Sequence, residues 1–227
     1  MKKKVLLSTI AFLVMMMQFC AGRQYVTPAY VDKSTNHRIV AVVPFEMVFT
    51  GKKPRKLTVR QVREIEEAES IAFQESLYRL LLRQTTRYRH PVRVGIQPVD
   101  KTNRILERNN IGIRDSWEMA PEELARILRV DAIVKTRVIK RRFMSGLASF
   151  GIEVGNAVLN AILEDTPFAV FVPNSTNAIK AECFICNGRD GVVLWGIDLV
   201  DETDWRMPAN EIIDNINRYF ARKFPYR

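Results

Sequence analysis

The chain has 227 residues, of which 47% are apolar and 26% are charged, a balance typical of folded globular proteins. This balance excludes a disordered chain, a collagen-like chain and a membrane protein with many spans. The length allows one good hydrophobic core, and three cysteines are too few for a disulfide scaffold. The net charge of +10 would suit a nucleic-acid binder, so its distribution along the chain decides how it is interpreted.

The first nineteen residues have the pattern of a secretory signal peptide. Three lysines at positions 2–4 precede an almost wholly apolar run at residues 5–19, which is too short to cross a bilayer comfortably as a helix. We therefore predict that residues 1–19 are removed. Their removal takes away three of the ten excess positive charges, and the remaining ones are scattered and form no nucleic-acid-binding motif. No nucleic-acid partner is expected.

Cys20 directly follows the apolar run and resembles the acylated cysteine of bacterial lipoproteins. The resemblance implies cleavage before Cys20 and a membrane anchor of fatty acyl chains, such as palmitate, on that residue. Residues 21 and 22 carry no obvious inner-membrane retention signal, so we expect an outer-membrane lipoprotein that faces the periplasm. Phe19 stands where lipoproteins usually have a small residue. The alternative is therefore cleavage after Gly22 by the ordinary signal peptidase, which would release a soluble periplasmic protein.

Residues 24–37 are polar, include Pro28 and show no periodicity, which predicts a tether. The predicted organisation is thus a signal peptide at residues 1–19, a lipidated cysteine and tether at residues 20–37, and one α/β domain at residues 38–227.

The predicted domain begins with a strand and a long helix. Residues 39–45 are a continuous apolar, β-branched run, as expected of a strand that is covered on both faces. Residues 58–87 change to a helical period, with Thr58 as a plausible N-cap. The apolar positions on one face of this helix are Val62, Ile65, Ala72, Phe73, Leu77, Leu80 and Leu81.

Two further strands and a short helix follow. Residues 92–96 alternate as a strand does, residues 121–128 start with Pro121 and two acids as a helix does, and residues 131–139 predict a third strand. Strands that alternate with helices imply crossover connections and a sheet that is at least partly parallel.

The C-terminal part predicts a hairpin and a helix. Strand candidates at residues 178–186 and 192–199 flank a five-residue gap that contains two glycines, which is typical of a β-hairpin. Residues 208–223 predict a closing helix that buries Ile212, Ile213, Ile216, Tyr219 and Phe220. The fold class expected is a single α/β domain with a mixed sheet, flanking helices, a C-terminal β-hairpin and a C-terminal helix.

Three segments, in order along the chain, resemble the curli-secretion lipoprotein (CsgG-like) superfamily, which includes the lipoprotein activators of penicillin-binding proteins (LpoB-like). Residues 38–45, Arg-Ile-Val-Ala-Val-Val-Pro-Phe, look like its opening strand. Residues 124–134 are similar to its helix and Asp-Ala-hydrophobic strand, and residues 187–195 are similar to its late turn with a closing Trp. The resemblance covers residues 38–220. It implies a mixed-sheet α/β fold and a non-enzymatic role as an envelope assembly or scaffolding lipoprotein, and it carries over no site residue except Cys20.

Candidate chemistry in the body of the chain is sparse. Cys183 and Cys186 form a C-x-x-C, but residues three apart in a regular strand point to opposite faces. We expect free buried thiols, and the alternative is a disulfide if a bulge re-aims one side chain. His37 and His90 are distant from this pair in sequence, so no metal site is predicted. No phosphate loop, nucleophile elbow or zincin motif occurs, so we expect no catalytic residue and no cofactor.

Two other segments have unusual composition. The acids of residues 64–69 lie on a helix that also carries arginines, which favours a solvated charged face. Gly151 and Gly155 are four residues apart in a stretch with helical apolar spacing, where small residues permit close packing. This pair would serve either internal packing or an interface for self-assembly or membrane contact.

These observations predict a non-enzymatic envelope lipoprotein that acts as a binding or assembly component of a secretion or cell-wall complex. Its expected partners are the membrane, through the lipid anchor, envelope proteins and other copies of itself. The alternatives are a soluble periplasmic enzyme or redox protein released after Gly22, and an oligomeric channel-forming subunit.

Overall fold

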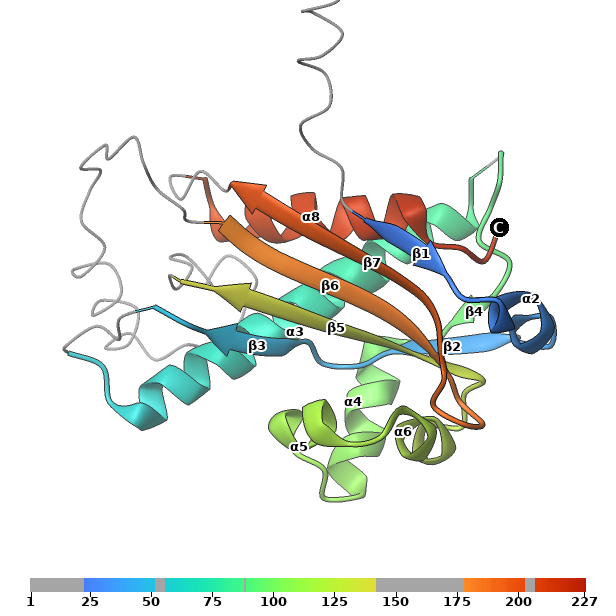
Figure 1. Ribbon diagram of the computed structural model, residues 1–227. Coiled ribbons are helices and arrows are strands. Elements are labelled where there is room, and N and C mark those ends of the chain that lie inside the picture. Colours follow the sequence, from blue (N-terminus) through green and yellow to red (C-terminus); the bar gives the residue numbers. More distant parts are fainter. Residues whose placement is uncertain (1–22, 52–55, 88, 142–177, 203–206) are drawn as a thin grey trace, which may run out of the picture.

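Seven strands of the computed structural model form one mixed sheet, which confirms the predicted fold class (Figure 1). The structure describes residues 23–51, 56–87, 89–141, 178–202 and 207–227. The strand order is β1-β7-β6-β5-β2-β4, with β3 beside the far half of β5. The strands are β1 (Gln24–Val26), β2 (Ile39–Val42), β3 (Glu46–Phe49), β4 (Gly95–Ile96), β5 (Ala132–Lys140), β6 (Ala178–Asn187) and β7 (Val193–Glu202).

The sheet divides into a parallel half and an antiparallel half. β2 pairs in parallel with β4 and β5, and β3 pairs in parallel with β5. β5, β6, β7 and β1 pair in antiparallel succession. The predicted crossovers and the predicted hairpin of β6 and β7 are therefore both confirmed.

The apolar run at residues 39–45 forms a strand that is interrupted at Pro44. Val42 pairs with Val134, and Glu46 pairs with Arg137. The chain thus advances four residues from β2 to β3 while β5 advances three. Proline lacks the N–H that a ladder requires, and a bulge accommodates it. The predicted burial on both faces is confirmed, because residues 40–43 and 45 are buried.

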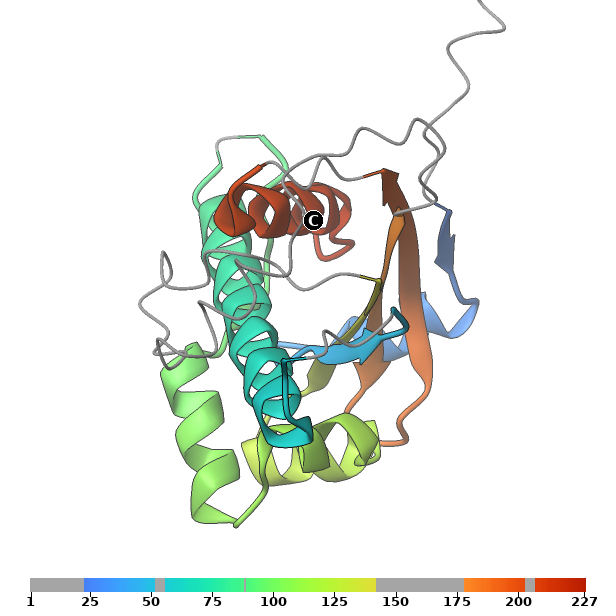
Figure 2. The ribbon, with the colours of Figure 1, turned by 90° about the vertical axis from the view of Figure 1, so that its left-hand side faces the viewer.

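Two helices cover the inner face of the sheet: α3 (Val59–Thr85) and α8 (Ala209–Lys223). Figure 2 shows both on the same side of the strands. Thr58 caps α3 as predicted, since its side chain accepts from the Gln61 N–H while the Gln61 side chain accepts from the Thr58 N–H at 2.8 Å. Between these helices and the strands lies the main core, in which the rings of Phe45 and Phe73 stack 5.3 Å apart.

Three shorter helices lie beyond the parallel half of the sheet: α4 (Val99–Arg108), α5 (Ile113–Glu118) and α6 (Pro121–Leu128). Only α6 matches a predicted helix, and it covers one end of the opposite face of β5 and β6. A second, smaller core fills the space beneath it, with Ala41, Val43, Leu106, Leu124, Ala125, Leu128 and Ile133. Among the described residues, no helix combines the length and the apolar character that crossing a membrane requires.

Part of the segment at residues 24–37, for which we expected a tether, has regular structure. Residues 24–26 form β1 at the edge of the sheet, and α2 (Ala29–Ser34) follows. The backbone N–H and the hydroxyl of Thr27 both donate to the Leu194 carbonyl at 3.0 Å, which anchors the segment to β7. A polar segment without periodicity can still add to a sheet edge, because edge pairing relies on backbone hydrogen bonds.

The expected solvated face at residues 64–69 is also wrong in part. Glu69 is fully buried and forms an ion pair with the equally buried Lys140 of β5. Glu66, also buried, pairs with Arg114 of α5, which bonds Glu67 at 3.0 Å as well. Acids on two sides of α3 therefore meet cations from other elements, one on β5 and one on α5. Burial lowers the pKa of the Lys140 ammonium to about 7, and the charge of Glu66 opposes this shift.

Candidate functional site

The face of the sheet opposite α3 and α8, here called the outer face, presents three rows of side chains. Successive residues of a strand point to opposite faces, so the strand registers decide which outward residues lie side by side. The first row is Lys135, Phe184, Gly196 and Tyr25; the second is Glu46, Arg137, Glu182 and Asp198; the third is Val48, Ile139, Lys180 and Val200. Every one of these residues except Gly196 is partly or largely exposed.

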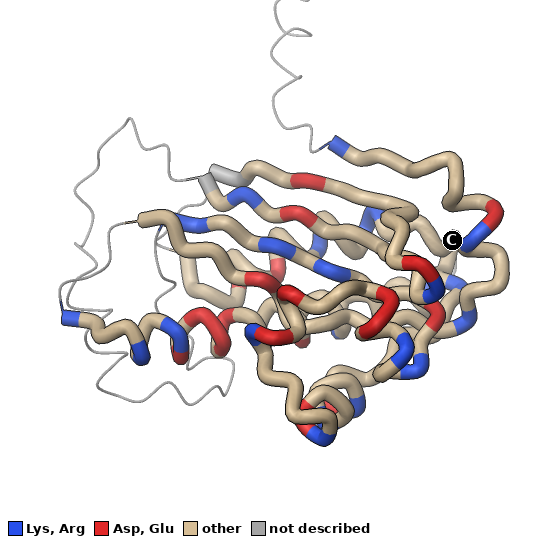
Figure 3. The backbone as a smooth tube through the Cα atoms, turned by 60° about the horizontal axis from the view of Figure 1, so that its bottom comes forward, with Lys and Arg blue, Asp and Glu red and all other residues tan. Residues whose placement is uncertain are grey.

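The second row is charged and contains paired side chains. Arg137 Nε lies 3.4 Å from Glu46 Oε1 across the β3–β5 ladder. Lys180 reaches back from the third row to Glu182 at 2.6 Å, and this hydrogen bond and the carboxylate charge raise the pKa of Lys180. Exposed ion pairs of this kind stabilise a fold by only about 0–1 kcal/mol, so they can exchange partners at little cost. Figure 3 shows acidic and basic residues interspersed along the described elements.

The third row is mostly aliphatic although it faces outward. Val48 and Ile139 are partly exposed, and Val200 is 54% exposed. In an antiparallel sheet with one solvated face, the residues that point toward solvent are normally polar. A row of aliphatic side chains beside exchangeable ion pairs is the composition of a protein interface, in which an apolar centre has a polar surround.

One end of the outer face is closed by the last turn of α5 and the residue that follows it. Lys135 Nζ donates to the carbonyls of Trp117 and Met119 at 2.7 and 2.9 Å. Burial lowers the pKa of Lys135, and the nearby Cys186, Glu46 and Glu122 side chains oppose this shift. The outer face therefore ends at Lys135 and is bounded there by α6.

A second polar cluster lies where the β6–β7 turn meets the C-terminus. His37 Nδ1 is 2.7 Å from the Tyr226 hydroxyl, and His37 Nε2 is 3.1 Å from Asn187 Oδ1. The Asn187 amide donates to Asp190 at 2.6 Å, and Asp190 also pairs with Lys33. Because Asn187 Oδ1 can only accept, Nε2 is the donor, and a neutral ring then accepts the Tyr226 proton at Nδ1. No sequence spacing connects these residues, so sequence reasoning missed them.

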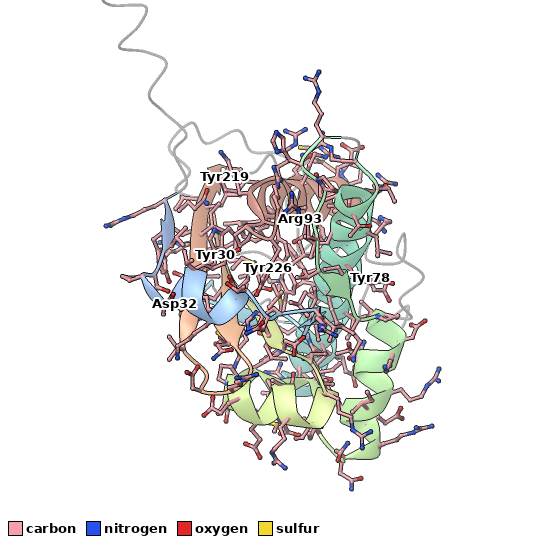
Figure 4. All side chains as sticks on the ribbon, turned by 90° about the vertical axis from the view of Figure 1, so that its right-hand side faces the viewer. Tyr30, Asp32, Tyr78, Arg93, Tyr219 and Tyr226 are labelled. Carbon is pink, nitrogen blue, oxygen red and sulfur yellow. The ribbon has the colours of Figure 1, made fainter. Side chains whose placement is uncertain are left out.

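This cluster fastens the fold. Figure 4 shows Tyr30 and Tyr226 close together, and their ring centroids are 6.0 Å apart. Burial raises the pKa of the Tyr226 hydroxyl, as expected of a phenol that closes a core. The cluster joins α2, the turn and the C-terminal residues, and its side chains are satisfied by one another.

The segments that resemble the CsgG-like pattern also have structural roles. Asp131 Oδ2 accepts from the backbone N–H groups of Arg38 and Ile39 at 2.8 and 3.0 Å, which joins the starts of β5 and β2. The Gly188 N–H donates to the Asp131 carbonyl at 2.8 Å, and Trp195 is buried against Phe224. These residues explain why the motif suits the fold, and they supply no chemistry.

Cys183 and Cys186 are both free and buried. Cys183 belongs to the main core on the inner face. Cys186 follows the register shift in β6, which lies between Ile185 and Cys186. Burial raises the pKa of both thiols, that of Cys186 to about 11. A disulfide between them stays a prediction for experiment.

The remaining predicted site residues fall outside the part of the chain that the structure describes. These are Cys20, Gly151 and Gly155. Within the described residues, no three His, Cys, Asp or Glu side chains are placed to hold a metal ion. A hollow of about 500 Å³ lies between α3 and α4, lined by Ile71, Asn103, Leu106, Ile111 and Ile113 among others.

No family model and no curated protein sequence matches the chain. Among solved structures, the PelC dodecamer from Paraburkholderia phytofirmans is similar at 11% identity and a TM-score of 0.42, over 88% of this chain and 94% of that one. Lipoprotein GNA1162 from Neisseria meningitidis is similar at 13% identity and a TM-score of 0.42, over 82% and 99%. The LpoB C-terminal domain from Salmonella enterica has 8% identity and a TM-score of 0.35, over 74% and 84%. These values are too low to assign a family or a function.

Proposed function

We propose that this protein is an envelope lipoprotein, anchored through Cys20, that binds a protein partner on its outer face as a non-enzymatic component of a secretion or cell-wall assembly complex. The observation that carries the proposal is the outer face itself, with an aliphatic row beside a row of exchangeable charges. The signal-peptide pattern and the position of Cys20 support the envelope location, and the CsgG-like segments support the class of complex.

The chemistry of the outer face defines the partner that would fit it. A partner must bring apolar side chains to Val48, Ile139 and Val200, each of which contributes about 25 cal/mol per Å² of apolar surface removed from water. It must also bring charges that complement Arg137 and Glu182, which orient it and select against wrong partners.

Position-specific crosslinking tests this binding role. A photoreactive residue in place of Ile139 on the outer face should crosslink to a distinct envelope protein in native membranes. The same residue in place of Arg104 on α4, which is exposed, is the matched control. Arg137→Glu, which reverses the charge between Glu46 and Glu182, should abolish the Ile139 crosslink while the protein stays folded, because exposed like charges across the ladder cost only about 1 kcal/mol. Crosslinks that are equal at both positions, or unaffected by Arg137→Glu, would contradict the proposal.

The anchor is tested separately. Radiolabelled palmitate should enter the wild-type protein and be absent from Cys20→Ala, which should then be released from membranes. A wild-type protein without label would support cleavage after Gly22 and the soluble periplasmic alternative. In that case the location in the envelope remains but the lipoprotein assignment fails.

A further inference from the structure

We propose that the sheet edge formed by Arg23, Tyr25, Val26 and Val200, here called the N-terminal edge, lies against the headgroups of the membrane that holds the Cys20 acyl chains. The inference rests on the proposed anchoring through Cys20. It adds a defined orientation, in which the sheet stands on this edge with its outer face accessible from the side.

The length of chain between the anchor and the fold carries the inference. The first strand in the described part of the chain starts at Gln24, four residues after Cys20, and four extended residues reach at most about 14 Å. A domain of this size has a radius of gyration of about 16 Å, which corresponds to a diameter of about 40 Å. The domain is therefore roughly three times as wide as the connection is long. The expected tether to residue 37 would have let the domain move freely. A connection of only four residues between Cys20 and β1 would instead hold β1 at the membrane surface.

β1 is fastened to the sheet and does not merely touch it. Its residues pair with β7 in register, and Asp198 N–H donates to the Arg23 carbonyl at 3.1 Å. The Tyr25 ring lies on Gly196, where a Cβ atom would come within 2.3 Å of Tyr25 Cζ. Only glycine leaves room for this ring, so the sequence of β7 is adapted to hold the N-terminal strand.

The surface chemistry of the N-terminal edge suits a lipid headgroup layer. Tyr25, Val26 and Val200 are 43%, 51% and 54% exposed, and they account for three of the seven large hydrophobic side chains that are exposed in the described part of the chain. Tyrosine is favoured at headgroup depth because its ring is apolar and its hydroxyl is polar. Arg23 is exposed beside them and would add about 1 kcal/mol of attraction to anionic lipid.

A second copy of the chain is the other occupant that such an edge could take. β1 offers only three residues for pairing, which is a short edge, and short edges resist pairing with another sheet. The membrane is favoured because the chain leads from this edge to the lipid-bearing residue within four positions.

An environment-sensitive fluorophore tests the orientation on the full-length acylated protein in vesicles of phosphatidylethanolamine and phosphatidylglycerol. NBD is attached at Val200→Cys on the N-terminal edge and, as a matched control, at Lys101→Cys on α4, which follows β4 at the opposite edge of the sheet. Both sites are exposed, whereas the native Cys183 and Cys186 are buried and should not be labelled. The Val200→Cys label should shift to shorter wavelength and be quenched by headgroup spin-labelled lipid, and the Lys101→Cys label should do neither.

The outcomes separate the two proposals. A protein that carries no acyl chain removes the anchor and with it both the lipoprotein assignment and this orientation. An acylated protein that floats with vesicles while the two labels behave alike overturns the orientation and leaves the anchor intact. A Val200→Cys label that shifts in detergent with rising protein concentration, before vesicles are added, identifies a second copy as the occupant and also overturns the orientation.

Discussion

The buried ion pair of Glu69 and Lys140 allows the sharpest test of how the fold is held together. Both side chains have no exposed surface, and the pair joins the middle of α3 to the end of β5. Lys140→Met keeps a side chain of similar length and removes the charge, which leaves the Glu69 carboxylate buried without its cation. Removing one partner of such a pair costs about 3–5 kcal/mol, because the remaining charge has lost its solvent and its counter-charge.

That loss is large for a protein of ordinary stability, since the free energy of unfolding of most domains is about 5–15 kcal/mol. With a urea dependence of about 2 kcal/mol per molar, the unfolding midpoint of Lys140→Met should fall by about 1.5–2.5 M. The double variant Lys140→Met, Glu69→Leu removes both charges. It should recover most of the loss, because well-packed apolar residues often replace a buried pair with no net cost.

The assay is urea unfolding of the soluble Cys20→Ala protein without its signal peptide, followed by circular dichroism. A pH of 6 keeps Lys140 protonated, since burial lowers its pKa only to about 7. Arg60→Met is the matched control, because it breaks the exposed pair with Glu64 on the same helix and should cost less than about 0.5 kcal/mol.

Two results would refute the reasoning. If Lys140→Met costs no more than Arg60→Met, the pair is not desolvated in solution. If the double variant is as unstable as Lys140→Met alone, the loss comes from packing and has no electrostatic origin.

Three other features of the fold give testable outcomes. Gly196→Ala places a methyl group against the Tyr25 ring and should loosen β1. The amides of β1 should then lose hydrogen-exchange protection, while those of β6 keep theirs. Retained protection in β1 would show that the contact is not tight. Cys183 and Cys186 should react with a thiol reagent at pH 8 only as fast as the protein unfolds, because burial raises both pKa values, and rapid reaction of two thiols in the native state would contradict their burial. The hydrogen bond from Lys33 of α2 lowers the pKa of Asp190 from 3.8 to about 2. The stability that this carboxylate contributes is therefore fully present above pH 3.8 and is lost as the pH falls through 2. A carboxyl titration by NMR with a midpoint near 3.8 would exclude this pairing.

Long periodic segments could be predicted from the sequence, because burial on a single face leaves a regular pattern. The helices at residues 59–85 and 209–223 and the hairpin of β6 and β7 all have this property. α4 and α5 were missed because they are short and bury few apolar side chains. Residues 24–37 were missed because β1 is held by backbone hydrogen bonds that any polar sequence can make.

The outer face could not be predicted, although each of its strands could. Which outward residues become neighbours depends on the register between strands, and a shift of one residue would exchange the faces. The bulge at Pro44, for example, is what brings Glu46 opposite Arg137. The burial of charged side chains could not be predicted either, because Glu69 stands in the same run of acids as the exposed Glu64 and differs from it only in what packs against α3. The predicted roles of Cys20, Gly151 and Gly155 stay predictions.

The two proposed surfaces share strand β7, and this couples anchoring to partner binding. Tyr25, Asp198 and Val200 belong to the outer face, and Tyr25 and Val200 also belong to the N-terminal edge. A partner that covers the third row as far as Val200 would therefore compete with the headgroups for that side chain. A partner that stops at Ile139 and Lys180 would not. Membrane-bound and released forms of the protein should then differ in their affinity for a partner that reaches Val200. They should have the same affinity for a partner that stops at Ile139 and Lys180. Comparing wild type with Cys20→Ala in the Ile139 crosslinking experiment distinguishes these two footprints.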